Sequence, residues 1–167
     1  MSKTEHNTIP APILDGIIFD RAADGTFGTN VPWSYDAGHS PNGFETGYLG
    51  SGPTEFATNA CAAVLGAAGI EYSGKISLRR GEIGAEAFRL RQYFKEAFIG
   101  VIQLEPGERY VLPYPLALYL IDKSAKDLGI ELRINRKLLG DMANLAMLAV
   151  AFSDRFKPEP PPASSLS

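Results

Sequence analysis

A glycine-rich segment at residues 38–57 runs into a stretch with helical periodicity, and the junction between them, GSGP at residues 50–53, is the part of the chain best suited to bind a ligand. Glycine lets backbone come close to a ligand, the first N–H groups of a helix have no intrahelical partner, and the helix dipole adds partial positive charge. The junction therefore predicts a site for a phosphate or a carboxylate. The alternative is a tight turn that packs under the helix, and Pro53 has no N–H to donate.

The predicted donors come from this loop, from the first helical turn and from two later arginines. Backbone N–H groups of residues 50–55 would ring the anion, with the Ser51 hydroxyl as a further donor. Arg79 and Arg80 would complete the pocket if the strand before them ends beside the loop. The carboxylate of Glu55 counts against an anion at this position. The predicted ligand-binding residues are Ser40, Asn42, Tyr48, Gly50, Ser51, Gly52, Thr54, Arg79 and Arg80.

Three residues of the same loop are candidates for catalysis. His39 is one of two histidines, and the other, His6, lies in a polar lead-in, so His39 is the side chain best placed to exchange a proton near neutral pH. With Glu45 to orient it, His39 could act as a general base, and Tyr48 could donate to a developing oxyanion. A lone histidine beside serine and proline more often caps a turn, which is the alternative.

Neither a metal nor a cofactor is predicted. One histidine in the loop and one cysteine, Cys61, stand 22 positions apart and match no known ligand spacing. Phosphodiester cleavage usually needs a metal held by several carboxylates, and residues 32–52 supply Asp36 and Glu45 only. The chain is therefore interpreted as noncatalytic, and Cys61 as a small core residue.

Composition limits the class of protein. The 167 residues, 45% hydrophobic and 10% aromatic, fit one domain with a real core. A net charge of -3 and a pI near 5.4 argue against a duplex-DNA binder. The unpaired cysteine indicates a reducing, cytoplasmic setting, and no segment is long and apolar enough to predict a membrane span.

The predicted fold is α+β, a small antiparallel sheet packed against about four helices in a single domain. Residues 13–19 and 26–31 are predicted as a hairpin around Asp24-Gly25. Further strands are expected at residues 75–79, 109–112 and 130–134. The expected helices cover residues 53–66, 87–102, 113–128 and 135–156.

The expected division of the chain follows these elements. Residues 1–12 are predicted to be a flexible lead-in, 13–129 the α+β domain, 130–156 a strand and helix extension, and 157–167 a disordered proline-rich tail. The helix at 135–156 has few charges, so more than one of its sides is expected to be buried. It could lie centrally in the domain or pair with a second copy of the chain.

The densest basic stretch is predicted to be a solvated face. Arg91 and Lys95 share one side of the expected second helix, whereas Arg89 points elsewhere, so these side chains cannot all reach one ligand. A nucleic-acid surface, with the neighbouring aromatics as stacking partners, is the weaker alternative.

Two segments, HSPNGFETGYLGSGPTEFATNACAAVLG and RQYFKEAFIGVIQLE, resemble a bacterial and phage family catalogued as domain of unknown function 6166. The resemblance covers roughly residues 13–121. The family's later glutamate is displaced here, because Glu96 follows Lys95 directly, and residues 130–167 extend beyond the family's domain. The residues that match are His39, Ser40, Pro41, Gly43, Phe44, Glu45, Gly47, Tyr48, Gly50, Ser51, Gly52, Pro53, Gln92, Phe94 and Lys95.

The resemblance implies a compact α+β accessory protein of phage origin and transfers no activity. Phage proteins of this size often sequester a small molecule or block a host enzyme, including enzymes of host defence. Three functions follow, in order of preference. The first is binding of an anionic, nucleotide-like ligand at the glycine-rich junction. The second is inhibition or assembly of a host protein through Trp33, Tyr35, Tyr48 and the C-terminal helix. The third is hydrolysis by His39 and Glu45.

Overall fold

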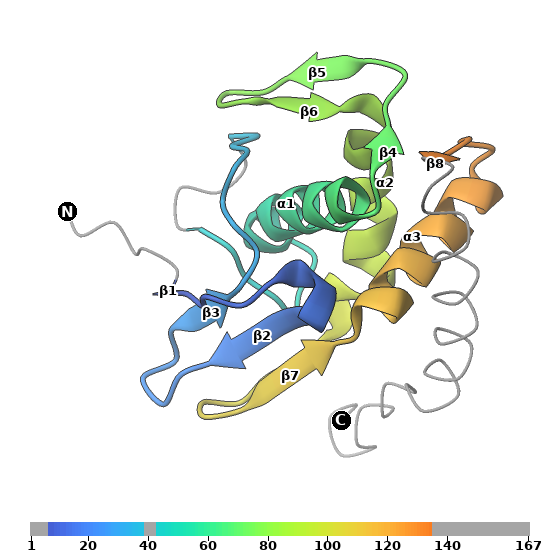
Figure 1. Cartoon of the computed structure of the whole chain (residues 1–167). Coiled ribbons are helices and arrows are strands. Elements are labelled where there is room, and N and C mark those ends of the chain that lie inside the picture. The colour runs from blue at the N-terminus through green and yellow to red at the C-terminus, as the bar shows by residue number, and fades with distance from the viewer. Residues whose placement is uncertain (1–6, 39–42, 135–167) are drawn as a thin grey trace, which may run out of the picture.

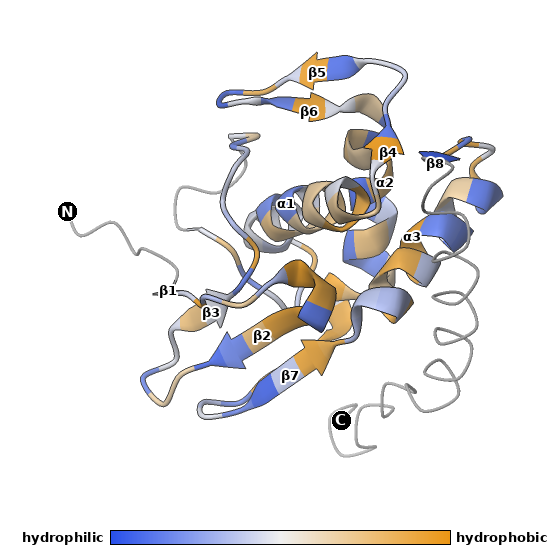
Figure 2. Ribbon diagram, viewed as in Figure 1, coloured by the Kyte–Doolittle hydropathy of each residue, from blue (hydrophilic) through white to orange (hydrophobic). Residues whose placement is uncertain are grey.

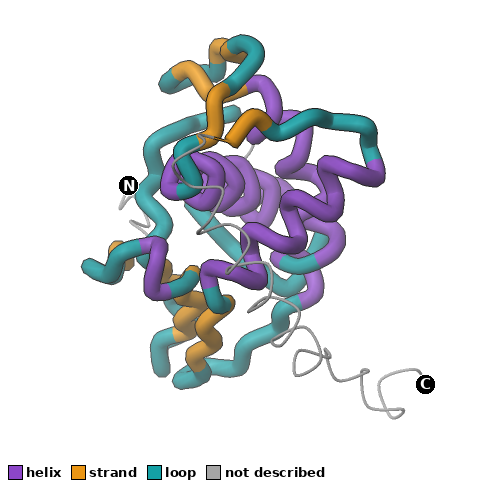
Figure 3. The backbone as a smooth tube through the Cα atoms, turned by 45° about the vertical axis from the view of Figure 1, so that its right-hand side comes forward, coloured by secondary structure: helices purple, strands orange, loops and turns teal. Residues whose placement is uncertain are grey.

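The computed structural model describes residues 7–38 and 43–134, and the fold is α+β, as predicted. A four-stranded sheet with the order β1-β3-β2-β7 lies on one side of the helices, and two short two-stranded sheets lie beyond them (Figure 1). The rotated view shows the three α-helices side by side between the sheets (Figure 3). The elements of the larger sheet are β1 (Asn7–Thr8), β2 (Ile17–Arg21), β3 (Phe27–Thr29) and β7 (Arg109–Leu112).

The predicted hairpin is confirmed, but its first strand begins at Ile17, and residues 13–15, which were expected to belong to it, form a 3-10 turn. Strands β2 and β3 pair antiparallel, with Asp20 opposite Gly28, and β7 pairs with the other edge of β2, with Ile17 opposite Leu112. Alternate residues of β2 are buried, so Ile17 and Phe19 face the helices. Figure 2 shows that β2 runs from a hydrophobic to a hydrophilic end, that β7 runs from a hydrophilic to a hydrophobic end, and that the two hydrophobic ends lie together.

The expectation of a flexible lead-in is wrong for its last residues. Strand β1 pairs parallel with β3, with Asn7 opposite Gly28, and the amide of Ile9 donates to Thr29 at 2.9 Å. The sheet is therefore mixed and not purely antiparallel. Residues 7–8 pair through backbone hydrogen bonds, which do not depend on the alternation of apolar residues that predicts a strand.

Helix α1 (Ser51–Ala67) is the central helix of the fold. It begins at Ser51, two residues before the predicted start, and Gly50 in extended conformation is its N-cap. The predicted apolar face is confirmed, but the polar residues Thr58 and Asn59 are buried as well. Because the sheet, α2 and α3 surround it, nearly every residue of α1 from Gly52 to Leu65 is buried.

An aromatic cluster joins α1 to the sheet. The ring centroid of Phe56 lies 5.2 Å from that of Phe19, 5.3 Å from that of Phe27 and 5.3 Å from that of Phe44. Phe98 adds a further contact to Phe19 at 5.9 Å. Aromatic residues bury large areas and prefer these edge-on and offset arrangements. The cluster therefore forms the centre of the core.

Helices α2 (Ala85–Ala97) and α3 (Tyr114–Asp127) cover the remaining sides of α1. The predicted second helix extended to residue 102, which is wrong. After Ala97 the chain tightens into the 3-10 turn η2 (Ile99–Val101), and Val101 is 48% exposed instead of buried. The predicted third helix is confirmed. The Tyr114 hydroxyl donates to the Val64 carbonyl oxygen at 3.0 Å and fixes α3 to α1.

The short elements complete the described chain. They are the 3-10 turn η1 (Ile13–Asp15), β4 (Ile70–Glu71), β5 (Lys75–Ser77), β6 (Glu82–Gly84) and β8 (Arg133–Ile134). Strand β6 was expected to be only the approach to a helix, but it pairs with β5. A strand was predicted within residues 130–134, and β8 confirms it by pairing with β4.

The expected fourth helix and the proline-rich tail lie outside the described residues. Within the described part, no helix is long and apolar enough to cross a membrane.

Candidate functional site

The predicted loop residues Glu45 and Tyr48 do lie against the first turn of α1. A Cβ atom at Gly50 would overlap the Tyr48 ring, and a Cβ at Gly52 would lie 2.7 Å from Glu45 Cβ and 3.1 Å from the Tyr48 hydroxyl oxygen. Only glycine therefore leaves room at these two positions for the side chains above them. Tyr48 is 49% exposed, so its ring covers the helix end on one side and faces solvent on the other.

The loop is fixed in this position by the 3-10 turn η2. The Thr46 hydroxyl donates to the carbonyl oxygens of Ile99 at 2.6 Å and Ile102 at 3.1 Å, and the Gly47 amide donates to Ile99 at 3.1 Å. Gly47 has a positive φ of 90°, which other residues rarely adopt. The loop therefore approaches α1 as an ordered segment.

Glu45 forms a bidentate ion pair with Arg21 of strand β2. The distances are 2.7 Å from Nη1 to Oε1 and 2.9 Å from Nη2 to Oε2. The hydrogen bond from Arg21 to Glu45 raises the pKa of the guanidinium, and the guanidinium also lies over the Phe27 ring. Both oxygens of Glu45 thus already accept hydrogen bonds, which leaves this carboxylate poorly placed to orient a histidine. His39 itself lies outside the described residues, as do Ser40 and Asn42.

Fewer backbone donors are free than predicted. The Thr54 amide donates to the Gly50 carbonyl oxygen at 3.1 Å, and the Thr54 hydroxyl donates to the same oxygen at 2.8 Å. Glu55 is the fifth residue of α1, so helix geometry pairs its amide with Ser51. The amides of Ser51 and Gly52 remain, since the N-cap residue Gly50 has no side chain to satisfy them. No acceptor for the Gly50 amide is found among the described residues either, so three of the five predicted amide donors remain.

The prediction of a solvated basic face is wrong for two residues of α2. Lys95 is only 8% exposed, and its ammonium nitrogen donates to the Thr54 hydroxyl oxygen at 3.0 Å, in the first turns of α1. No carboxylate lies within 4.0 Å of it among the described residues. Arg91 is half-buried, its guanidinium stacks on the Phe88 ring at 3.5 Å, and burial lowers its pKa. Arg89 remains exposed, as expected.

Lys95 is the functional candidate that sequence reasoning missed. The position of Lys95 in the sequence indicates its burial. It follows the buried Phe94 and lies four residues after Arg91, on the side of α2 that packs against α1. The charges around Lys95 favoured a solvated face, whereas its contact with Thr54 shows that this side of α2 is buried against α1.

Arg79 and Arg80 lie beside another segment than the one predicted. Backbone hydrogen bonds of 3.1 Å pair Arg80 with Asp36, and the Arg80 side chain donates to the Trp33 carbonyl oxygen at 2.6 Å. Arg79 is 75% exposed and lies 4.0 Å from the Asp36 carboxylate. The described polar contacts of both arginines are thus with residues 33–38 and not with the first turn of α1.

Two buried polar side chains of α1 hold the segment that leads into residue 39. The Asn59 amide oxygen accepts from the backbone amides of Ser34 and Tyr35 at 2.9 Å each, and its nitrogen donates to the Tyr35 carbonyl oxygen at 2.9 Å. Glu55, which is fully buried, accepts from the Ala37 amide at 3.3 Å. The chain is therefore fixed to the side of α1 up to Ala37.

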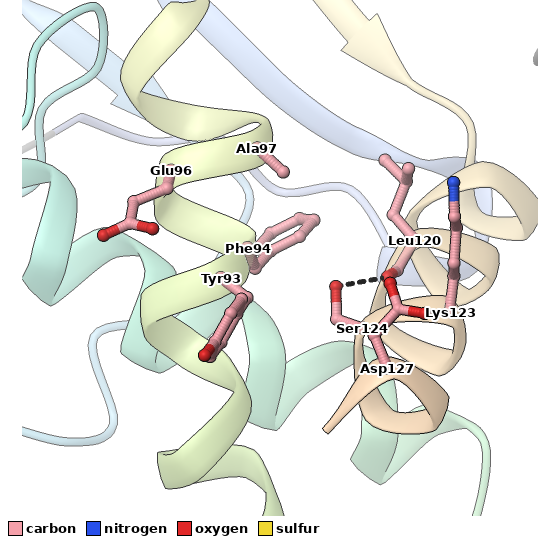
Figure 4. Close-up of a pocket in the computed structure, with 8 residues that line it drawn as sticks. All are labelled: Tyr93, Phe94, Glu96, Ala97, Leu120, Lys123, Ser124 and Asp127. Carbon is pink, nitrogen blue, oxygen red and sulfur yellow. Dashed lines mark hydrogen bonds between the residues drawn. The ribbon is translucent and has the colours of Figure 1, made fainter. Parts of the chain in front are cut away.

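A groove between α2 and α3 lies apart from the predicted site. Its volume is about 390 Å³, and Figure 4 shows side chains of both helices facing each other across it. Its lining residues are Tyr93, Phe94, Glu96, Ala97, Leu120, Lys123, Ser124 and Asp127. None of them was predicted to bind a ligand.

The described residues hold no cluster of three or more side chains that could bind a metal ion. Cys61 is fully buried, and burial raises the pKa of its thiol, which keeps it protonated and unreactive, as expected of a core residue. Comparison of the chain with protein-family models, with curated proteins and with solved structures found no match. The resemblance to the family of unknown function stays a prediction.

Two glycines of α1, Gly52 and Gly66, test how closely the loop at residues 45–48 packs on the helix. We expect Gly52→Ala to lower the free energy of unfolding by about 1–3 kcal/mol, because the new methyl meets Glu45, which Arg21 holds in place. Gly66 has no atom within 4 Å of the corresponding position, so Gly66→Ala should raise stability by about 0.5–1 kcal/mol. Urea unfolding measures both. Equal stability of the two variants would contradict the close approach at Gly52.

Proposed function

We propose that this chain is a noncatalytic accessory protein that binds a small, anionic, nucleotide-like ligand at the first turn of α1. One observation supports the proposal most: the buried ammonium group of Lys95 lies next to that turn without a carboxylate partner among the described residues. A buried cation costs free energy unless an opposite charge offsets it. An anion bound at the helix end would supply that charge.

The neighbouring groups suit such a ligand. The amides of Ser51 and Gly52 point out of the helix end, where the dipole favours negative charge. The nearby carboxylate of Glu45 would repel an anion, but its ion pair with Arg21 offsets its charge. The half-exposed ring of Tyr48 offers a face on which a base could stack and a hydroxyl that could donate to a phosphate. A phage origin and a cytoplasmic location belong to the same proposal.

Thermal unfolding of the full chain with inorganic phosphate and with AMP tests the proposal. A ligand at one hundred times its dissociation constant adds about 2.7 kcal/mol of stability, which for a domain of this size raises Tm by roughly 5–10 °C. We expect AMP to raise Tm and Lys95→Met to weaken AMP binding about tenfold or more, because a charged hydrogen-bonding group is lost. Methionine keeps the unbranched apolar stem of the lysine.

Arg89→Met is the matched control for this experiment. It removes the same charge from the exposed side of α2 and should leave the AMP-induced shift unchanged. Equal losses in the two variants would show that only net charge matters. An unchanged Tm of the wild-type chain with both ligands would overturn the proposal.

A second candidate function is docking of a host protein, which would make the chain an inhibitor or an assembly factor. Three apolar side chains at the loop and η2 are exposed together, Tyr48 at 49%, Leu49 at 65% and Val101 at 48%. The Leu49 side chain and the Tyr48 carbonyl oxygen lie beside Gly100, which precedes Val101 in η2. Such residues anchor protein interfaces. The third candidate, hydrolysis, ranks lowest because Arg21 binds both oxygens of Glu45.

A further inference from the structure

The groove between α2 and α3 is apolar at its floor and polar at its rim. Phe94, Ala97 and Leu120 line the floor, Asp127 lies beside it on α3, and the carboxylate of Glu96 points away from α3 (Figure 4). The Ser124 hydroxyl donates to the Leu120 carbonyl oxygen at 2.9 Å, so it needs no partner from outside. A groove of this kind suits the apolar side of a helix.

The described chain ends close to this groove. Strand β8 ends at Ile134, and β8 follows α3 after a short connection in which the Ile130 amide donates to the Ala125 carbonyl oxygen at 2.8 Å. Figures 1 and 3 both place the described end of the chain near the carboxyl end of α3. Residues 135–137 could span about 10 Å when extended.

The sequence beyond Ile134 carries a stripe that fits such a floor. The stripe repeats at intervals of four and three residues, which places its members on one side of a helix. Its members are Leu138, Met142, Leu145, Ala149 and Phe152. The core formed by the described residues is closed around α1 without it, so the stripe needs an apolar surface outside that core.

We propose that residues 138–152 form a helix that packs into the groove between α2 and α3 of the same chain, antiparallel to α3. The charges agree with this direction. Arg136 and Lys137 precede the stripe and would lie near Asp127 and the partially negative carboxyl end of α3.

Engineered disulfides in the full chain test this packing. Ala97 is an exposed small residue of the groove, so Ala97→Cys should preserve the fold. We combine it with Leu145→Cys or Met142→Cys from the stripe, so that a shift by one helical turn does not hide a contact. The native Cys61 is fully buried and should not compete. Oxidation is expected to cross-link at least one of these pairs within a single chain, visible as unchanged mass in non-reducing electrophoresis and loss of free thiols.

Ala143→Cys with Ala97→Cys is the matched control. Residue 143 lies on the opposite side of the helix from residue 145, so we expect its cross-link to form at least about tenfold more slowly. The reduced variants should unfold at the wild-type temperature. Cross-links only between two chains would assign the stripe to a second copy and overturn the proposal. Equal rates for 143 and the stripe positions, or no cross-link at any position, would overturn it as well.

Discussion

Replacement of Phe56 by alanine is expected to lower the free energy of unfolding by about 3–5 kcal/mol. The ring of Phe56 is fully buried and lies within 5.3 Å of the rings of Phe19, Phe27 and Phe44, so its removal leaves a cavity that the sheet and α1 cannot close. A loss of this size is a large part of the stability of a typical domain. Chemical denaturation followed by the fluorescence of Trp33 measures it.

Phe88→Ala is the control for this experiment. Phe88 is only partly buried at the edge of the core, where the Arg91 guanidinium covers its ring. We expect its replacement to cost less than half as much as that of Phe56, because most of the space it leaves opens to water. A smaller loss for Phe56→Ala than for Phe88→Ala would contradict the central place of Phe56 in the core.

Replacement of Asn59 by alanine is expected to cost about 2–4 kcal/mol, because buried donors and acceptors lose their partners. Its side chain makes one hydrogen bond with Ser34 and two with Tyr35, each of 2.9 Å. The segment at residues 33–37 should then detach from α1. Hydrogen exchange of the Ser34 and Tyr35 amides should accelerate at least about tenfold, since their protection depends on this side chain.

Thr58→Val separates this effect from a general loss of polarity in α1. The Thr58 hydroxyl donates only to the Thr54 carbonyl oxygen of its own helix, at 2.8 Å, and valine has nearly the same shape. We expect a change within about 1 kcal/mol and no faster exchange at Ser34 or Tyr35. Fast exchange in both variants, or in neither, would show that Asn59 does not hold the segment.

The buried side of helix α1 is a feature that the sequence predicts correctly. Ala57, Cys61 and Leu65 recur at intervals of four residues, and the expectation that they face the core is confirmed. The α+β class and the β2–β3 hairpin followed from alternation and turn residues in the same way. These features are encoded locally, in the order of apolar and polar residues.

Features that depend on distant partners were missed. Strand β1 joins the sheet through backbone groups, and Lys95 is buried only because Thr54, 41 positions earlier, lies opposite it. Glu45 forms an ion pair with Arg21, a residue for which no role was predicted. Arg80 was assigned to the glycine-rich loop but pairs with Asp36. In each case the determining contact joins segments that no local pattern connects.

The pairing of Ile17 with Leu112 has a consequence for synthesis in the cell. Strand β2 leaves the ribosome about 90 residues before β7, which at ordinary elongation rates is a delay of roughly 5–20 seconds. Until β7 emerges, the nascent chain exposes one edge of β2 with its unpaired backbone groups. Such an open edge can associate with other chains, so the nascent chain should be most prone to aggregation in this interval.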